Sequence, residues 1–356
     1  MSLAAGNPSA NAHRWVMLLL ILAAAISPLL ALRHGAVSMG LSELLTALNP
    51  LSDLSARPET LFFRQVLMEI RLPRVLLGMV VGAALALSGA MLQTLFRNPL
   101  ADPGLIGTAA GAALAGAMAM ILVPLTMPAV ATLLGLWLVP IFSFLGALMA
   151  LLVVLRLAGH AGHLDPAHLL LAGIAINALA GAGIGLLVYI ASDDQLRNFT
   201  VWTLGTLAGA NWTAFMLLSL VCALTLALSP WLARPLNALL LSEGDARCLG
   251  FPVGLIKLVV MLLAALCVGA SVAFCGIIGF VGLVVPNLMR LIVGPDHRLL
   301  LPASALAGAV VLTLSDLAAR LMIAPAELPI GILTALIGAP FFILLLRRRV
   351  RQAAHA

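Results

Sequence analysis

The side chains that could do chemistry in this chain are few, because only 9% of its 356 residues are charged. Asp316 and Arg320 lie four residues apart within one long apolar stretch. On a helix this spacing places both on one face, where they can neutralise each other. Carriers driven by protons or sodium usually need a carboxylate within the membrane. Asp316 is the candidate for that role, and its pairing with Arg320 is the structural alternative.

Motifs for catalysis or metal binding are missing. The sequence has no G-x-x-x-x-G-K-[ST] phosphate loop and no H-E-x-x-H pair. His160, His163 and His168 fall in one short loop, where a solvated turn is favoured over a metal site. The spacing of the four cysteines indicates neither a disulfide framework nor a zinc site. We therefore expect no catalytic residue, no metal ligand and no bound cofactor, and a chain that cannot hydrolyse ATP alone.

The composition decides the class of fold. Hydrophobic residues make up 63% of the chain and its mean hydropathy is +1.17, whereas a soluble domain carries about 25% charged residues. In lipid every backbone group must be hydrogen-bonded within the protein, and long unbroken apolar runs achieve this as helices. We expect an all-α polytopic membrane protein with about ten transmembrane helices. The predicted spans are Trp15–Leu32, Val75–Leu95, Leu105–Val123, Val130–Leu155, Ala167–Ala191, Trp212–Leu232, Leu255–Phe274, Ile277–Val293, Pro302–Ile323 and Leu328–Leu346.

The Lys and Arg residues predict the orientation, because cytoplasmic loops carry an excess of them. With a cytoplasmic N-terminus, 12 of the 19 basic residues lie inside, among them the Arg347–Arg351 cluster after the last span. An even number of spans then leaves both termini in the cytoplasm. The pI of about 10.1 reflects this bias and does not indicate nucleic acid. The seven basic residues expected outside are Arg33, Arg57, Arg64, Arg71, Arg74, Arg197 and Arg320.

An interruption follows the second span, where residues 96–107 read FRNPLADPGLIG. Asp102 precedes a proline there, and Asp165 precedes a proline before the fifth span. A carboxylate that caps the first backbone N–H groups, followed by proline at the first helical position, is a typical helix start. Capping leaves Arg97-Asn98-Pro99-Leu100 unexplained, since this turn places an amide and a leucine at the inner mouth of the bundle.

Several long blocks of sequence resemble one known family. RLPRVLLGMVVGAALALSGAMLQTLFRNPLADPGLIG, residues 71–107, is similar to the signature of permease subunits of ABC importers for iron-siderophores, haem and vitamin B12. The resemblance covers nearly the whole chain, in order, and that family also has ten spans. Further matching blocks are GDARCLGF (Gly244–Phe251), GFVGLVVPNLMRL (Gly279–Leu291), GPDHRLLLP (Gly294–Pro302) and AELPIGILTALIGAPFFILLL (Ala326–Leu346).

The resemblance implies the architecture of a type II ABC importer, with residues 1–356 as one transmembrane permease domain. It implies a second copy of the chain, two cytoplasmic ATPase subunits that bind ATP and Mg²⁺, and a periplasmic substrate-binding protein. The segment 239–251 is amphipathic and matches the family's ATPase-docking element; an interfacial helix on lipid headgroups is the alternative. The expected coupling residues are Leu241, Ser242, Glu243, Gly244, Asp245, Ala246, Arg247, Cys248, Leu249, Gly250 and Phe251.

Three arginines are expected to dock the binding protein. Arg71 and Arg74 begin the second span on the outer side, where cations oppose both the helix dipole and the orientation bias. This placement indicates an anionic partner, and lipid phosphate reached by snorkelling is the alternative. In the similar vitamin B12 permease, arginines matching these two and Arg320 pair with acidic residues of the binding protein. For Arg320, the internal pair with Asp316 competes with docking.

The resemblance also implies a gate at the inner end of the pathway. Asn98 and Leu100 match its first element. Its second element departs from the family pattern, because Asp165-Pro166-Ala167 stands where small hydroxylated residues are usual. The fifth and tenth spans are expected to line the central path between two copies. The small residues that would allow close helix approach there are Gly181, Gly185, Gly331 and Gly338.

The sequence therefore predicts the permease subunit of an ATP-driven importer in the inner membrane, without an ATPase site of its own. Haem is the favoured cargo on resemblance alone, and a ferric siderophore or cobalamin is the alternative. A secondary carrier that uses Asp316 is the rival from another class of protein. An intramembrane enzyme is weaker still, since no nucleophile–base or metal-ligand pattern occurs.

Overall fold

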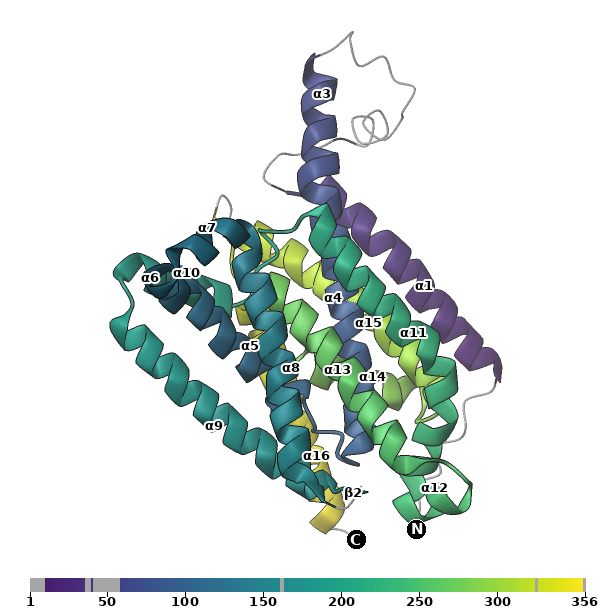
Figure 1. The fold of residues 1–356 in the computed structure, drawn as a ribbon. Coiled ribbons are helices and arrows are strands. Elements are labelled where there is room, and N and C mark those ends of the chain that lie inside the picture. Colours follow the sequence, from purple (N-terminus) through teal and green to yellow (C-terminus); the bar gives the residue numbers. More distant parts are fainter. Residues whose placement is uncertain (1–9, 36–39, 41–57, 161–162, 324–325, 355–356) are drawn as a thin grey trace.

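The computed structural model describes residues 10–35, 40, 58–160, 163–323 and 326–354. Arg57, one of the basic residues expected outside, falls outside these ranges. The described residues are almost entirely helical (Figure 1), apart from two short strands that pair antiparallel. The elements are α1 (Ala10–Arg33), α3 (Pro58–Gln65), η1 (Val66–Arg71), α4 (Leu72–Leu95), η2 (Pro103–Ile106), α5 (Thr108–Ala117), η3 (Met118–Leu122), α6 (Val123–Thr126), α7 (Pro128–Leu134), η4 (Gly135–Trp137), α8 (Leu138–Ala158), β1 (Gly159–His160), β2 (His163–Leu164), α9 (Pro166–Ile190), α10 (Asp193–Thr203), α11 (Trp212–Leu241), α12 (Glu243–Cys248), α13 (Val253–Cys275), α14 (Val281–Val293), α15 (His297–Met322) and α16 (Ile330–Ala354).

The ten predicted spans all have counterparts in this bundle. Within the described residues, 8 helices are long and apolar enough to cross a membrane, and two shorter apolar helices cover Val281–Val293 and Ile330–Leu344. One of the eight, Leu61–Leu95, continues α4 backwards through η1 into α3, which projects from the bundle (Figure 1). The all-α polytopic fold class is therefore confirmed.

The predicted start of the eighth span is wrong. Helix α14 begins at Val281 and has 13 residues, a length of about 20 Å that is short of a ~30 Å hydrocarbon core. The preceding residues cannot be helical, because Gly276 and Phe280 have φ angles of +69° and +67°. A side chain at Gly276 would also overlap the backbone carbonyl of Trp202. The near-contact of the seventh and eighth spans in the sequence predicts a sharp reversal near Cys275-Gly276, but the apolar residues that follow give no sign that the break continues to Phe280.

Helix α4 forms the centre of the bundle. It is apolar on all sides, as expected for a fully enclosed helix, and 20 of its 24 residues are buried. Glycines bring its neighbours close: a methyl group at Gly82 would overlap the carbonyl of Gly308 in α15, and one at Gly89 would overlap that of Gly282 in α14. Any larger residue at these crossings would force α15 or α14 away from the core.

Helices α9 and α16 lie at the periphery of the single chain. Tyr189 in α9 is 87% exposed. A methyl group at Gly181 or Gly185 would meet nothing within 4 Å, so these glycines face open space. By contrast, Gly331 packs on the Leu204 carbonyl and Gly338 on the ring of Phe280. The glycines of the tenth span therefore pack on residues of the same chain, whereas those of the fifth span are uncovered; that both spans line a path between two copies stays a prediction.

The two ends of the bundle can be named from Figure 1. Helix α12 lies at one end, where α1 begins and α16 ends; we call this the α12 end. Helix α3 projects from the opposite end, the α3 end, where α1 ends and α4 begins. Residues with a predicted role gather at both ends, and α4 runs between them.

Candidate functional site

At the α12 end, the predicted coupling segment forms one short helix with a defined start and stop. Ser242 caps it, its hydroxyl accepting a hydrogen bond from the Asp245 amide at 2.8 Å. At its other end the Phe251 amide donates to the Ala246 carbonyl at 3.0 Å and the Gly250 amide to Arg247 at 2.9 Å. This pair of bonds, with Gly250 at φ +83°, is a Schellman stop. The local sequence alone therefore fixes α12.

A buried ion pair ties α12 to the bundle. The ammonium group of Lys257 in α13 is 2% exposed and contacts the Glu243 carboxylate. It also donates to the Leu164 carbonyl at 2.6 Å, beside the start of α9. Lys257 thus joins α12, α13 and the segment before α9. Its role was missed from the sequence, although it is the only lysine of the chain and stands fourteen residues after Glu243.

The surface of α12 combines exposed apolar and charged groups. Leu241 is 70% and Leu249 63% exposed, one at each end of the helix. Asp245 and Arg247 are exposed between them, whereas Ala246 is fully buried against the bundle. A short, rigid helix with two exposed leucines suits insertion into a complementary cleft. It is too short to lie stably on a membrane by itself.

The turn after α4 has the structured form that its composition predicts. Arg97 adopts φ +48°, and its side chain donates to the Leu239 carbonyl of α11 at 3.1 Å. The Asn98 side chain accepts a hydrogen bond from the Leu100 amide at 2.9 Å. Asp102 caps η2 by accepting from the Gly104 amide at 2.7 Å. Asn98 and Leu100 are therefore held by a local turn that is anchored on α11.

Asp165 caps α9 as the sequence predicts. Its carboxylate accepts from the Ala167 amide at 3.1 Å and pairs with His168 at 2.8 Å. The first of these bonds, aided by His168, lowers the pKa of Asp165. Both Asp165 and Ala167 are exposed.

The two predicted gate elements meet deeper in α9 than Asp165-Pro166-Ala167. The Asn177 side chain donates to the Gly104 carbonyl at 3.1 Å. Gly173 packs so closely on the Leu105 carbonyl that a methyl group there would overlap it. The sequence interpretation missed these residues; the small Gly173 and the polar Asn177 within an apolar span were the available signals. The gate assignment of residues 98, 100 and 165–167 stays a prediction.

At the α3 end, charged side chains from distant parts of the chain form a cluster that is buried except for Glu327, whose side chain is 44% exposed. Arg74 in α4 contacts Asp316 of α15 at 2.9 Å and Glu327, before α16, also at 2.9 Å. Asp316 pairs with Arg320 at 3.0 Å. We call Arg74, Asp316, Arg320 and Glu327 the outer ion cluster. The Asp316–Arg320 pair is confirmed, whereas Arg74 and Glu327 were missed as its partners.

The outer ion cluster also holds the end of α1. Arg71 donates to the Leu32 carbonyl at 2.6 Å, and Arg320 lies 3.4 Å from the carbonyls of Ala31 and His34. These bonds satisfy carbonyl groups that a helix C-terminus leaves free. Arg71, Arg74 and Arg320 are all buried. In this structure their charges are directed to groups of the same chain, and docking of a binding protein stays a prediction.

The fold and both ends of the bundle match a known family of transporters. The sequence profile of the FecCD transport family matches residues 17–348. The chain belongs to this family. It is 48% identical over 285 residues to the hemin transport system permease protein HmuU of Yersinia pestis, covering 80% of this chain and 84% of that protein. It is also 45% identical over 284 residues to the cobalamin import system permease protein BtuC of Halobacterium salinarum, covering 80% and 74%.

A solved structure supports the same assignment for this FecCD family member. A metal-chelate type ABC transporter in an inward-facing conformation superposes with a TM-score of 0.80 and 32% sequence identity, covering 94% of this chain and 99% of that one. The chain is therefore a multi-pass permease of the ABC importer type, as the sequence blocks predicted. The roles of α12, the gate and the outer ion cluster are matters for experiment.

Proposed function

We propose that this chain is the membrane-spanning subunit of an ATP-driven haem importer. The observation that carries the proposal is the 48% identity to the HmuU permease, which spans 80% of the chain. A large and largely apolar chelate such as haem suits a path that presents few charges. The charged side chains of the outer ion cluster are paired with one another and leave such a path largely uncharged. Cobalamin is the second candidate, because BtuC permeases are 45% and 41% identical.

We place the partners by the chemistry of the two ends. Two copies of the chain enclose the path, with the uncovered glycines of α9 toward the second copy. Two ATPase subunits dock on α12 and residues 241–251, and they supply the ATP and Mg²⁺ sites for which this sequence has no phosphate loop. The α12 end then faces the cytoplasm, with both termini. A periplasmic binding protein docks at the α3 end through Arg71, Arg74 and Arg320, exchanging partners within the outer ion cluster.

Transport follows from a shift between two conformations. ATP binds the partner subunits more tightly in one state, and only this difference in affinity can move the equilibrium. The movement reaches the membrane through α12 and Lys257, and then α13 and the start of α9. The gate formed by Asn98, Leu100 and residues 165–167 opens or closes in response. The chain forms no covalent intermediate.

The secondary-carrier alternative is disfavoured by the surroundings of Asp316. A coupling carboxylate must release and bind a cation in each cycle, but Asp316 contacts two arginines, Arg74 and Arg320. With two cations beside it, the carboxylate has no charge left to attract a third.

Uptake by proteoliposomes tests the proposal. The purified subunit is reconstituted with and without its co-expressed ATPase, and haem, a ferric siderophore and cobalamin are each presented with a candidate binding protein. We expect haem uptake that requires both ATPase and ATP. If cobalamin were the only compound taken up, the cargo would be cobalamin rather than haem, and the proposed ATP-driven mechanism would stand. Uptake by the lone subunit along a pH or sodium gradient would refute the importer and return attention to Asp316.

A further inference from the structure

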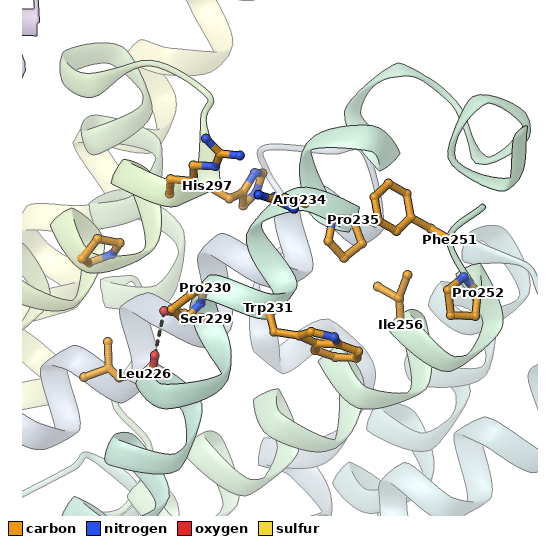
Figure 2. A pocket seen from close by; sticks show the side chains of 12 residues that line it. Leu226, Ser229, Pro230, Trp231, Arg234, Pro235, Phe251, Pro252, Ile256 and His297 are labelled. Atoms are coloured by element: carbon orange, nitrogen blue, oxygen red, sulfur yellow. Dashed lines mark hydrogen bonds between the residues drawn. The ribbon is translucent and has the colours of Figure 1, made fainter. Parts of the chain in front are cut away.

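A cavity of about 700 Å³ opens at the α12 end between α11, α13 and the start of α15. Its walls are mostly apolar, with Trp231, Phe251 and Ile256 among them, and two arginines line it, Arg234 and Arg298. Figure 2 shows the Arg234 side chain beside His297 and the Trp231 indole toward Ile256. One predicted coupling residue, Phe251, borders this cavity, and none of the predicted gate or docking residues lines it.

Two prolines shape the wall that α11 contributes. Pro230 and Pro235 lie within the helix, where each removes a backbone donor. The carbonyl of Leu226, which would accept from residue 230, receives the Ser229 hydroxyl at 2.8 Å instead (Figure 2, dashed line). The Leu226 carbonyl therefore keeps a hydrogen-bond donor although residue 230 is a proline. The proline rings give the cavity a smooth apolar side.

The cavity opens on the surface of α11 that is exposed along its length. Leu220, Leu224 and Trp231 are exposed and follow one another at intervals of four and seven residues, which places them on one face. Arg234, also exposed, stands three residues further on the same face. A lipid-facing apolar stripe therefore ends in a tryptophan and an arginine at the α12 end. That order is typical of the boundary between acyl chains and headgroups.

The polar neighbours of the cavity offset only part of its positive charge: Arg298 lies close enough to Asp296 to help lower the pKa of that carboxyl group, and Arg234 forms no ion pair with the described residues. His297 is buried, with its two ring nitrogens 2.7 Å from Asn237 Oδ1 and 2.7 Å from Thr94 Oγ1. Asp296, the acidic residue at the start of α15, accepts from the Asn237 side chain at 2.6 Å and from the Arg298 amide at 3.0 Å. Arg234 and Arg298 remain as two exposed guanidinium groups that form no ion pair with the described residues.

We infer that this cavity binds an anionic glycerophospholipid of the leaflet at the α12 end. Its phosphate lies between Arg234 and Arg298, because guanidinium groups bind phosphate oxygens in a bidentate manner. One acyl chain passes Trp231 and follows Leu224 along the exposed face of α11. The apolar walls and the continuous lipid-facing stripe favour a lipid over a free anion. Basic pockets between helices on the cytoplasmic side are suited to anionic headgroups.

Native mass spectrometry of the full-length chain tests the site. The protein is titrated with phosphatidylglycerol and, separately, with phosphatidylcholine of the same acyl chains. We expect the double variant Arg234→Gln/Arg298→Gln to bind phosphatidylglycerol about 30-fold more weakly, since each basic side chain near an anionic headgroup contributes about 5-fold. Its weak binding of phosphatidylcholine should not change. The variant Arg234→Lys keeps the charge and should retain most of the binding.

The matched control is Arg156→Gln, an exposed arginine in the last turn of α8 that does not line the cavity. Equal weakening by this control, or unchanged phosphatidylglycerol binding in the double variant, would overturn the proposal. Displacement of the lipid by millimolar inorganic phosphate would identify a free-anion site instead. Loss of the lipid whenever the ATPase is bound would assign the cavity to the subunit interface. Unfolding midpoints within about 2 °C of the parent show that the variants are folded.

Discussion

The outer ion cluster and α12 are both tied down by charged side chains, but the chain builds them differently. At the α3 end, Arg74 pairs with residues 242 and 253 positions away, so α4, α15 and the segment before α16 must be assembled before Arg74 is paired. At the α12 end, Glu243 and Lys257 are 14 positions apart and the helix between them has its own cap and stop. The outer ion cluster thus holds together parts of the fold that are distant in the sequence, whereas α12 folds locally and is attached to the bundle through Lys257. This asymmetry fits the proposal that the permease is driven from the α12 end.

The largest effect is expected from breaking the outer ion cluster. Asp316→Asn keeps the shape of the side chain but leaves Arg320 without its carboxylate and Arg74 with only Glu327. Breaking a buried pair on one side costs about 3–5 kcal/mol. We expect unfolding in mixed micelles at correspondingly lower denaturant concentration, and poor accumulation in the membrane.

The control for this variant is Asp194→Asn, an exposed carboxylate in the first turn of α10. It should change the free energy of unfolding by no more than about 0.5 kcal/mol. If Asp316→Asn were as stable as this control yet inactive, the cluster would be functional rather than structural. The contrast between the two ends would then fail.

Loss of the Glu243–Lys257 ion pair at the α12 end should reduce transport more than it reduces the stability of the fold. The double variant Lys257→Met/Glu243→Leu replaces both members of the ion pair by apolar side chains of similar size, which is often neutral for stability. We expect the unfolding midpoint to change little and ATP-dependent uptake in proteoliposomes to fall about tenfold, a loss of ~1.4 kcal/mol in coupling. ATP hydrolysis by the assembled complex should continue. A parallel loss of folding and uptake would mean that Lys257 acts only in packing.

A smaller effect is expected from the stop of α12. Gly250 has φ +83° and open space around it, so Gly250→Ala introduces backbone strain of about 1 kcal/mol and no overlap. Gly244→Ala is the matched control, because it lies inside α12 and alanine there favours the helix by a similar amount. Uptake should decrease several-fold for the first and stay unchanged for the second. The same loss in both would show that bulk on α12, rather than its geometry, matters.

The smallest effect concerns Asp165. Hydrogen bonds from Ala167 and His168 lower its pKa, so the stabilisation it gives is present at neutral pH. It is lost only as the pH falls through that lowered value, below about pH 4. When both chains also carry His168→Asn, which leaves the Ala167 bond as the cause of the lowered pKa, the difference in unfolding midpoint between Asp165 and Asp165→Ala should therefore be constant from pH 5 to 8. A difference that changed between pH 6 and 8 would assign the titration to another group.

The features that sequence could predict are those encoded within a few residues. The two Asp-Pro helix starts at residues 102 and 165 both cap their helices, and the composition was enough for the helical membrane fold. The resemblance placed α12 correctly within 239–251. Such signals are local because a cap or a Schellman stop depends on the backbone of one turn.

The missed features depend on residues brought together by packing. Glu327 could not be assigned to Arg74, since nothing in the chain between them records that α4 and the start of α16 are neighbours. The sequence predicts a sharp reversal near Cys275-Gly276, where Gly276 has a positive φ, but not the continuation of the non-helical stretch to Phe280, a non-glycine residue at positive φ. The meeting of Gly104 with Asn177, rather than with residues 165–167, reflects how far the turn after α4 reaches along α9.

The account depends most directly on α12 as the docking site of the ATPase, and Cys248 offers a test. It is exposed on α12, whereas Cys222, Cys267 and Cys275 are buried, so a thiol-reactive photocrosslinker attached in the folded protein should react at one position. In membranes with the co-expressed ATPase, we predict a single adduct with the combined mass of permease and ATPase. A chain with Cys248→Ser and Asp194→Cys, labelled at the opposite end, should give none. An ATPase adduct from position 194, or none from Cys248 despite full labelling, would contradict the account.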